Sequence, residues 1–124
     1  VNIDGTYHLF YRTAADPLMN MHETSTDLFG KWEHDFDFQK YMSTLYRPGS
    51  FEAATTYILP DGKWCLMLDF FGCEKEKMGY VPFISEKAGD AHFHQVNQLF
   101  TFPYGFKHGG VIEISDEEYE KLLS

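Results

Sequence analysis

One pattern occurs twice in this sequence: Asp4-Gly5-Thr6-Tyr7-His8-Leu9-Phe10-Tyr11 is matched by Asp61-Gly62-Lys63-Trp64-Cys65-Leu66-Met67-Leu68, 57 residues further on. Each copy is an Asp-Gly dipeptide followed by a run of mainly aromatic and aliphatic residues. Such a run after Asp-Gly is typical of a strand that leaves a tight hairpin turn. The sequence therefore predicts two related, strand-rich units.

A second match extends the repeat. Residues 25–32 have a counterpart in residues 85–93, at an offset of about 60 residues, and both are polar turns with a glycine that deliver an aromatic residue into the next strand. A coincidental pair of hairpins is the simpler alternative. Two matches at one interval, without helical periodicity between them, favour four-stranded blades of a β-propeller.

The same turn and strand signals locate the individual elements. We expect strands at residues 5–12, 20–24, 31–38, 52–59, 63–71, 79–85, 93–100 and 109–114. The one convincing helix ends the chain, where Ser115 and Glu118 form a capping box and Asp116 stands in the first turn. The predicted fold class is therefore all-β with a short C-terminal helix.

Size and charge limit the classes of partner. The 124 residues, 44% of them hydrophobic, suit one domain with a single core. A formal charge of −9 repels nucleic-acid phosphates and anionic lipid surfaces, so we expect neither as a partner. No apolar run reaches the roughly 18 residues of a membrane span. The first residues also lack a signal-peptide pattern, so no compartment is indicated.

Glu52 is the first candidate for chemistry. It is the single carboxylate at the start of an otherwise uncharged strand, in the stretch Arg-Pro-Gly-Ser-Phe-Glu-Ala-Ala-Thr-Thr-Tyr at 47–57. Burial beside Phe51 would disfavour the charged form of Glu52, as a general acid requires. A strand-end glutamate that faces water is the other interpretation, and both stay open on the residues alone.

The order of four motifs is more specific than any one of them. Along the chain follow Gly49-Ser50-Phe51-Glu52-Ala53, Asp61-Gly62-Lys63-Trp64, Gly79-Tyr80-Val81-Pro82-Phe83-Ile84-Ser85 and Phe106-Lys107-His108-Gly109-Gly110-Val111-Ile112. This order resembles the third to fifth blades of glycoside hydrolase family 43, five-bladed β-propeller enzymes that include arabinosidases and xylosidases. The opening unit, with residues 22–28 and Gly30-Lys31-Trp32, is similar to their second blade.

The resemblance covers nearly the whole chain and implies both fold and activity. It implies one partial five-bladed propeller domain over residues 1–124, with a second-blade-like unit at 1–46 and units like blades three to five at 47–124. It also implies a glycosidase, a hydrolase of O-glycosyl bonds in carbohydrate metabolism. Its expected substrates are arabinose- or xylose-containing glycans.

The resemblance assigns roles to single residues as well. In the family, the glutamate that matches Glu52 is the general acid that protonates the departing glycosidic oxygen. The histidine that matches His108 lies near the propeller axis, and calcium near His108 is the one cofactor that the resemblance suggests. Phe51, Tyr80 and Phe83 are candidates for stacking on sugar rings, and with His108 they form the expected substrate-binding set.

One departure from the family limits the expected activity. Inversion needs a second carboxylate, roughly 6.5 to 9.5 Å from the first, to activate water. The family supplies this base from its first blade, and a further aspartate of the second blade tunes the acid. Asp16-Pro17 follows the strand of Tyr7 instead of preceding it, so Glu52 is the one recognisable member of the three. We therefore expect a truncated or split member with little activity alone.

Two other functions share this fold and stay open. One is a non-catalytic carbohydrate-binding or assembly module derived from the same propeller, and the other is a structural fragment without a ligand. Two or so blades cannot close a ring. We therefore expect a homo-oligomer, or missing N-terminal blades, to cover the open flanks.

Other residues with chemical potential carry weaker signals. His92 and His94 stand two apart and share one face of a strand, but two ligands do not make a metal site. Cys65 and Cys73 are expected to be free thiols, although a bridge between them stays open. Core packing is the expected role of the two tryptophans, Trp32 and Trp64.

Overall fold

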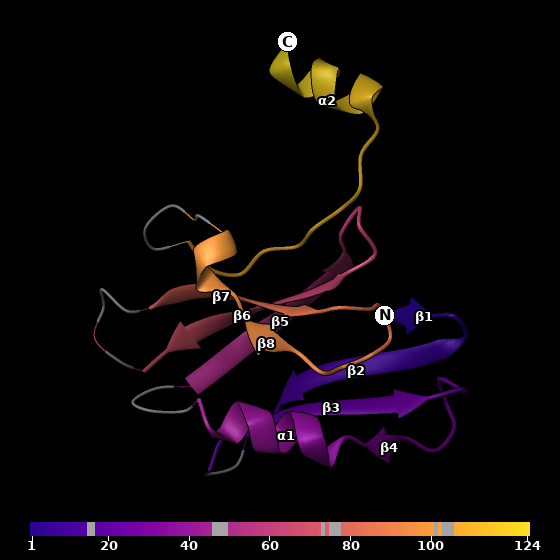
Figure 1. The fold of residues 1–124 in the computed structure, drawn as a ribbon, viewed down its shortest axis with the longest axis vertical. Coiled ribbons are helices and arrows are strands. Elements are labelled where there is room, and N and C mark those ends of the chain that lie inside the picture. Colours follow the sequence, from indigo (N-terminus) through magenta and orange to yellow (C-terminus); the bar gives the residue numbers. More distant parts are fainter. Residues whose placement is uncertain (15–16, 46–49, 73, 75–77, 101, 103–105) are drawn as a thin grey trace.

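The computed structural model describes residues 1–14, 17–45, 50–72, 74, 78–100, 102 and 106–124. The elements are β1 (Asn2–Ile3), β2 (Thr6–Arg12), β3 (Asn20–Ser25), β4 (Glu33–His34), α1 (Phe36–Ser43), β5 (Ser50–Ile58), β6 (Trp64–Phe71), β7 (Gly79–Ser85), β8 (His94–Gln95), the 3₁₀ turn η2 (Asn97–Leu99) and α2 (Asp116–Leu123). Among the described residues, the strands form two antiparallel four-stranded sheets, ordered β1-β2-β3-β4 and β5-β6-β7-β8 (Figure 1). The molecule is thus mostly β, as predicted.

Both Asp-Gly turns are present. Asp4 and Gly5 have positive φ values of 50° and 86°, and they join β1 to β2 with two residues, since Ile3 pairs with Thr6. A two-residue turn with positive φ at both positions is type I′, whose twist matches that of the flanking strands. Gly62, with φ of 85°, lies in the turn between β5 and β6. The repeat in the sequence therefore corresponds to a hairpin in each sheet.

The second match is present as well. Ser25 ends β3, and its buried hydroxyl lies 2.7 Å from the carbonyl oxygen of Asp27. Ser85 ends β7, and its buried hydroxyl lies 3.3 Å from the carbonyl oxygen of Lys87. Each serine thus fixes the turn that leads from the third strand of its sheet to the fourth.

The strand predicted at 31–38 is wrong for most of its length. β4 spans two residues, and α1 then begins after Asp35. The carboxylate of Asp35 accepts a hydrogen bond of 3.0 Å from the backbone N–H of Phe38, which makes Asp35 the N-cap. Phe38 and Met42, four residues apart, are the buried side chains of this helix. The helical spacing of this pair outweighs the strand-like alternation that precedes it.

The strand predicted at 93–100 is also shorter than expected. β8 pairs Gln95 with Phe83 and His94 with Ile84, and the next residue, Val96, donates its N–H to the carbonyl of Pro82 at 3.0 Å. Because Pro82 has no N–H, it cannot return that hydrogen bond. The ladder therefore stops, and the chain turns into η2.

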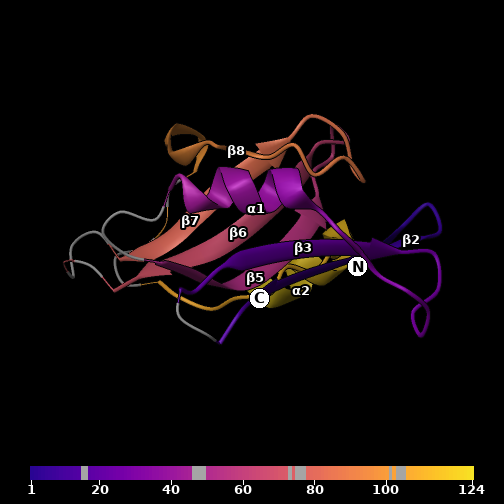
Figure 2. The ribbon, with the colours of Figure 1, turned by 90° about the horizontal axis from the view of Figure 1, so that it is seen from below.

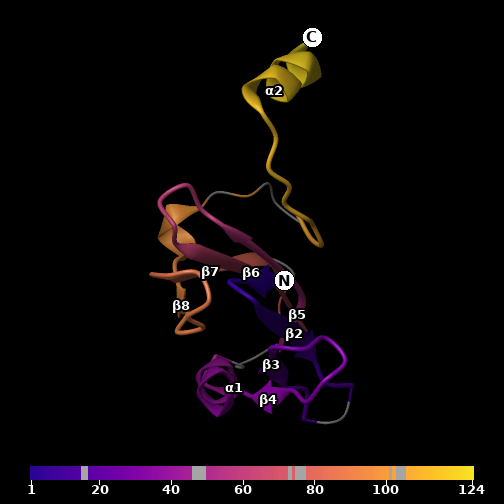
Figure 3. The ribbon, with the colours of Figure 1, turned by 90° about the vertical axis from the view of Figure 1, so that its right-hand side faces the viewer.

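The strand predicted at 109–114 is absent: residues 109–115 have no regular structure and lead to α2. α2 begins with the predicted capping box of Ser115 and Glu118. All residues from 106 to 124 are exposed, and α2 stands apart from the sheets, at the end of the molecule opposite α1 (Figures 1 and 3). The apolar side chains of this segment thus find no core within the part of the chain that the structure describes.

One aromatic core joins the two sheets and α1. Trp64 of β6 is fully buried, and its ring centroid lies 5.5 Å from that of Phe10 in β2 and 5.0 Å from that of Phe93. The other buried members come from both sheets and from α1: Ile3, Phe38, Met42, Phe51, Leu66, Leu68, Val81 and Phe83. In Figure 2, α1 lies beside β3, which it contacts. The role predicted for Trp64 is thus confirmed.

A smaller cluster covers the other face of the second sheet. Its buried members are Cys65, Met67, Ile84 and Val96. Cys65 is a buried free thiol, and Cys73 lies outside the described residues. β6 is therefore buried on both faces.

Two buried histidines continue the core in a chain of hydrogen bonds. Nδ1 of His22 lies 2.7 Å from Oδ2 of Asp35, and Nε2 of His22 lies 3.0 Å from Nδ1 of His8. Because Nδ1 of His22 donates to the carboxylate, its Nε2 accepts from His8, and both rings are neutral. Burial lowers the pKa of His8 to about 4, helped by the neighbouring His22. Burial also lowers the pKa of His22, against the opposing effect of Asp35.

The folded state should lose stability as the pH falls from 6.5 toward 4. The pKa of His8 is lowered from 6.5 to about 4, so its contribution to stability is complete above 6.5 and is lost as the pH falls toward the folded-state value. The shift corresponds to about 3 kcal/mol. Urea unfolding over a pH series measures it, and His8→Phe should flatten the profile.

His94 of β8 offers the matched control, because it is exposed. The variant His94→Gln should change the free energy of unfolding by less than about 0.5 kcal/mol at any pH in the series. If the free energy of unfolding of His8→Phe fell with pH as steeply as that of the wild type, the pH dependence could not be assigned to His8.

Candidate functional site

Glu52 lies where the two sheets meet. It is near the start of β5, an edge strand of the second sheet, and its side chain is 31% exposed. Its carboxylate forms an ion pair of 3.4 Å with the guanidinium of Arg12, the last residue of β2. The Arg12 guanidinium carbon also lies 5.6 Å from the ring centroid of Phe71. The glutamate singled out in the sequence is therefore a partly exposed carboxylate held by an arginine of the other sheet.

A β-bulge follows Glu52 directly. Glu52 pairs with Asp69 and Thr55 pairs with Met67, so two residues of β5 oppose one residue of β6. Ala53, within the bulge, has a positive φ of 52°, a conformation that alanine rarely adopts. Bulges redirect side chains and are frequent next to active sites. The bulge therefore separates Glu52 from the regular ladder of the rest of β5.

Asp69 lies directly opposite Glu52 and was not anticipated as a site residue. In the strand register Glu52 pairs with Asp69, and Asp69 pairs with Tyr80 of β7. Residues paired across strands point to the same face, so these three side chains form one row, the Glu52 row. The Asp69 side chain is only 1% exposed. Asp69 is the one charged residue in an otherwise apolar strand, and such an acid is costly to bury. The sequence alone could therefore have indicated Asp69 as a candidate site residue.

His108 covers the buried carboxylate. The backbone N–H of His108 donates to both oxygens of Asp69, at 3.3 and 3.2 Å, and ring Nδ1 lies 2.7 Å from Oδ2. Burial raises the pKa of Asp69, while the hydrogen bond and charge of His108 and the charge of Lys107 oppose the rise; the charge of Glu52 adds to it. The chain thus brings His108 to the strand that carries the partner of Glu52.

Tyr80 ties down the next residue of the same segment. Its phenolic oxygen accepts a hydrogen bond from the backbone N–H of Gly109. A Cβ on Gly109 would lie 3.1 Å from that oxygen, so a larger residue there would have to displace the Tyr80 hydroxyl by a few tenths of an ångström. Burial raises the pKa of Tyr80, and the charge of Asp69 adds to this. The structure therefore brings together three of the predicted site residues, Glu52, Tyr80 and His108.

Phe51 and Phe83 lie elsewhere, which corrects their predicted role as stacking residues. Their exposed fractions are 3% and 0%, and their ring centroids are 5.7 Å apart within the aromatic core. Neither ring leaves a face open to a sugar. Side chains alternate between the two faces of a strand, so Phe51 points away from the face that carries its neighbour Glu52.

The described residues do not fit a calcium site built by the protein. Calcium takes six to eight oxygen ligands, whereas His108 offers a ring with one nitrogen already bonded to Asp69. Within the ranges that the structure describes, no three histidine, cysteine, aspartate or glutamate side chains could hold a metal ion together. His92, of the His92 and His94 pair, is bonded to Asp90 instead.

Asp69 is a poor candidate for the second catalytic carboxylate, although it is the partner of Glu52 in the ladder. A catalytic base must contact a water molecule, and Asp69 is shielded by its own burial and by His108. Asp16 of the Asp16-Pro17 pair lies outside the described residues, as do Arg47, Pro48 and Gly49 of the motif that precedes Glu52. Among the described residues, the predicted acid Glu52 therefore has no recognised base.

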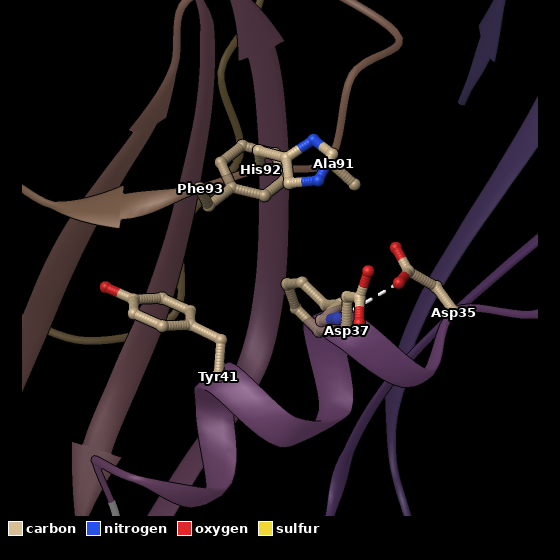
Figure 4. Close-up of a pocket in the computed structure, with 7 residues that line it drawn as sticks. Asp35, Asp37, Tyr41, Ala91, His92 and Phe93 are labelled. Carbon is tan, nitrogen blue, oxygen red and sulfur yellow. Dashed lines mark hydrogen bonds between the residues drawn. The ribbon is translucent and has the colours of Figure 1, made fainter.

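A cavity of about 250 Å³ lies apart from Glu52, between α1 and residues 91–93. Figure 4 shows Asp35, Asp37 and Tyr41 of the helix side facing His92 across it. A hydrogen bond to Asp90 raises the pKa of His92, and the charges of Asp35 and Asp37 add to the rise. Asp35, one of the residues that line this cavity, is also the N-cap of α1.

A second cavity, of about 370 Å³, lies at the end of the buried histidine chain. It is lined by His8, His22, Thr24, Glu33, His34, Asp35, Gly89, Asp90 and Ala91. The residues of the Glu52 row are absent from the lining of both cavities. The cavities and the predicted acid therefore belong to different parts of the molecule.

Comparison with known families identifies the class of protein. A family model described as a probable glycosyl hydrolase domain matches residues 1–120. The chain belongs to this family, which is related to glycoside hydrolase family 43, and the predicted resemblance is confirmed at that level. No curated protein and no solved structure matches the chain. Among the described residues, no helix is long and apolar enough to cross a membrane.

Shortening Phe83 tests its assignment to the core. Replacing a fully buried phenylalanine by alanine leaves a cavity, so Phe83→Ala should lower the free energy of unfolding by about 3 to 5 kcal/mol. Phe29, which is 94% exposed, is the control, and Phe29→Ala should change it by less than about 0.5 kcal/mol. Urea unfolding measures both variants. If both variants changed the free energy of unfolding equally little, the assignment of Phe83 to the core would be wrong.

Proposed function

We propose that this glycosyl hydrolase domain acts on arabinose- or xylose-containing glycans, with Glu52 as its general acid. The observation that carries the proposal is the placement of Glu52. It is partly exposed, and it is the one charged residue of β5. A bulge follows it, and its carboxylate lies 3.4 Å from the guanidinium of Arg12 in the other sheet. The family supplies the reaction class, cleavage of a glycosidic bond.

Each residue of the site has a part in this reaction. Glu52 in its protonated form gives its proton to the departing glycosidic oxygen, and Arg12 stabilises the carboxylate that remains. The Glu52 row places Tyr80 on the same face of the sheet as the acid. Tyr80 is partly exposed, so its ring and hydroxyl can contact a sugar.

The two sheets support a propeller as the complete fold. Each is an antiparallel meander of four strands, which is the structure of a propeller blade. We assign residues 1–46 to a second-blade-like unit. The described residues of 47–124 form one four-stranded sheet, so we assign to this range one blade and not the units like blades three to five that the resemblance implies. In this proposal a further blade, or a second copy of the chain, supplies the base that activates water. The chain alone then has little activity.

Replacing Glu52 by glutamine tests the acid. Glu52→Gln keeps the shape and removes the proton, so turnover of substrates with poor leaving groups should fall about a hundredfold or more. An aryl glycoside with a good leaving group needs little protonation and should lose much less. Initial rates on both substrates measure this, in the assembly that shows activity.

The exposed Glu86, on the turn after β7, provides the control for this experiment, and Glu86→Gln should keep full activity on both substrates. Cleavage that ignores Glu52→Gln would refute the proposed acid. If sugars bind but no preparation cleaves them, the chain is a carbohydrate-binding module instead.

We also propose that the chain self-associates. Its C-terminal segment exposes a series of large apolar side chains: Phe106, Val111, Ile112, Ile114, Tyr119, Leu122 and Leu123. Such side chains gain free energy when they leave water. A contact between copies is expected to bury more than roughly 1,000 Å².

Sedimentation equilibrium at micromolar concentration should therefore show a dimer or a larger species. The double variant Ile112→Asp with Leu122→Asp should shift the chain to a monomer, because it places charge on the apolar segment. Glu117→Gln, on the same helix, should leave the mass unchanged. A wild-type monomer would remove self-association from the proposal.

A further inference from the structure

Asp69 is buried at a cost that packing alone does not explain. Its side chain is 1% exposed, in a strand whose neighbouring side chains are apolar. Removing a carboxylate from water is unfavourable unless its oxygens are bonded well. Here both oxygens are bonded to His108: its backbone N–H reaches both at 3.2 to 3.3 Å, and ring Nδ1 reaches one at 2.7 Å.

The same contacts fix the direction of the His108 ring. Because Nδ1 lies against the carboxylate, it carries a proton, and Nε2 points away from Asp69 at the opposite side of the ring. The ring is 61% exposed although its inner edge is tied down. His108 also has a positive φ of 45°, outside the usual range for a residue with a side chain. The chain thus holds one exposed imidazole in one orientation.

The position of this ring relates it to Glu52. Asp69, which holds the ring, is the ladder partner of Glu52, and the charge of Glu52 acts on Asp69. Tyr80, on the other side of Asp69, holds the next residue, Gly109. A sugar whose glycosidic oxygen reaches Glu52 would therefore meet groups of the same row with its hydroxyls.

We propose that Asp69 is a positioning residue, which holds His108 so that Nε2 forms a hydrogen bond with a sugar hydroxyl next to Glu52. This inference rests on the proposed function, because it takes the ligand to be a glycan. The alternative is that Asp69 only anchors the C-terminal segment to the sheet. In that case the orientation of the ring has no effect on the ligand.

Binding in a cycle of variants separates the two. Xylotriose and arabinotriose are titrated by calorimetry into Glu52→Gln, which cannot turn them over by acid catalysis, and into this variant with Asp69→Asn, with His108→Ala and with both. The loss of one hydrogen bond to the sugar should weaken binding about fivefold. Because Asp69 acts through His108, either change should have this effect, and the two together should weaken binding no further.

Asp90→Asn in the same background is the matched control. Asp90 is the partner of another exposed histidine, His92, outside the Glu52 row, so binding should change less than twofold. The ring itself is observed by ¹⁵N NMR of the wild type, where Nδ1 should carry the proton, and Asp69→Asn should abolish that preference. This readout needs neither ligand nor activity.

The outcomes are distinct. Independent, additive losses from Asp69→Asn and His108→Ala, no loss from either, or an unchanged ring tautomer in Asp69→Asn would overturn the proposal. So would the absence of binding of both saccharides to the Glu52→Gln protein. If the cycle behaves as expected but no hydrolysis depends on Glu52, the proposed reaction fails, while the binding role of Asp69 and His108 stands. If hydrolysis depends on Glu52 but sugar binding does not change in Asp69→Asn, the proposed reaction stands and the binding role of Asp69 and His108 fails.

Discussion

Burial of the Trp64 ring is the constraint on which the rest of the structure depends. The ring has no exposed surface and contacts His8 and Phe10 of the first sheet, at centroid distances of 4.9 and 5.5 Å. Among the described residues its Nε1 has no hydrogen-bond partner. A buried N–H without a partner costs about 1 to 3 kcal/mol, so the apolar contacts of the ring must outweigh it. His8 and His22 lie against the same ring, and His22 is hydrogen-bonded to Asp35, the N-cap of α1. The contact between the sheets and the start of α1 therefore both depend on the surroundings of Trp64.

Local signals made much of the fold predictable. Asp4-Gly5 specifies a turn with positive φ at both positions, and Ser115 with Glu118 specifies the start of α2, so each needs only its own residues. The failures depend on partners. Residues 93–100 alternate like a strand, but the ladder stops because Pro82, on the neighbouring strand, lacks an N–H. The alternation at 109–114 likewise lacks a paired strand among the described residues.

The site was also predictable only in part, because some of its features depend on local residues and others on partners distant in the sequence. Glu52 stands out as an acid in an uncharged strand, and the same argument applied to β6 would have found Asp69. The period of two within a strand also separates Phe51 from Glu52, so only one of these neighbours can face the site. The bond between Asp69 and His108 joins residues 39 positions apart. No local pattern of either segment encodes that contact.

The position of β5 in its sheet decides how the first sheet reaches Glu52. Among the described strands β5 pairs with β6 alone, so its other edge belongs to no ladder there. Two side chains of the first sheet lie at β5 instead: Asn20 of β3 donates to the carbonyl of Phe51 at 3.2 Å, and Arg12 of β2 pairs with Glu52 at 3.4 Å. The orientation of the Glu52 carboxylate is therefore coupled to the packing of one sheet on the other, and a change at that interface would be felt at Glu52.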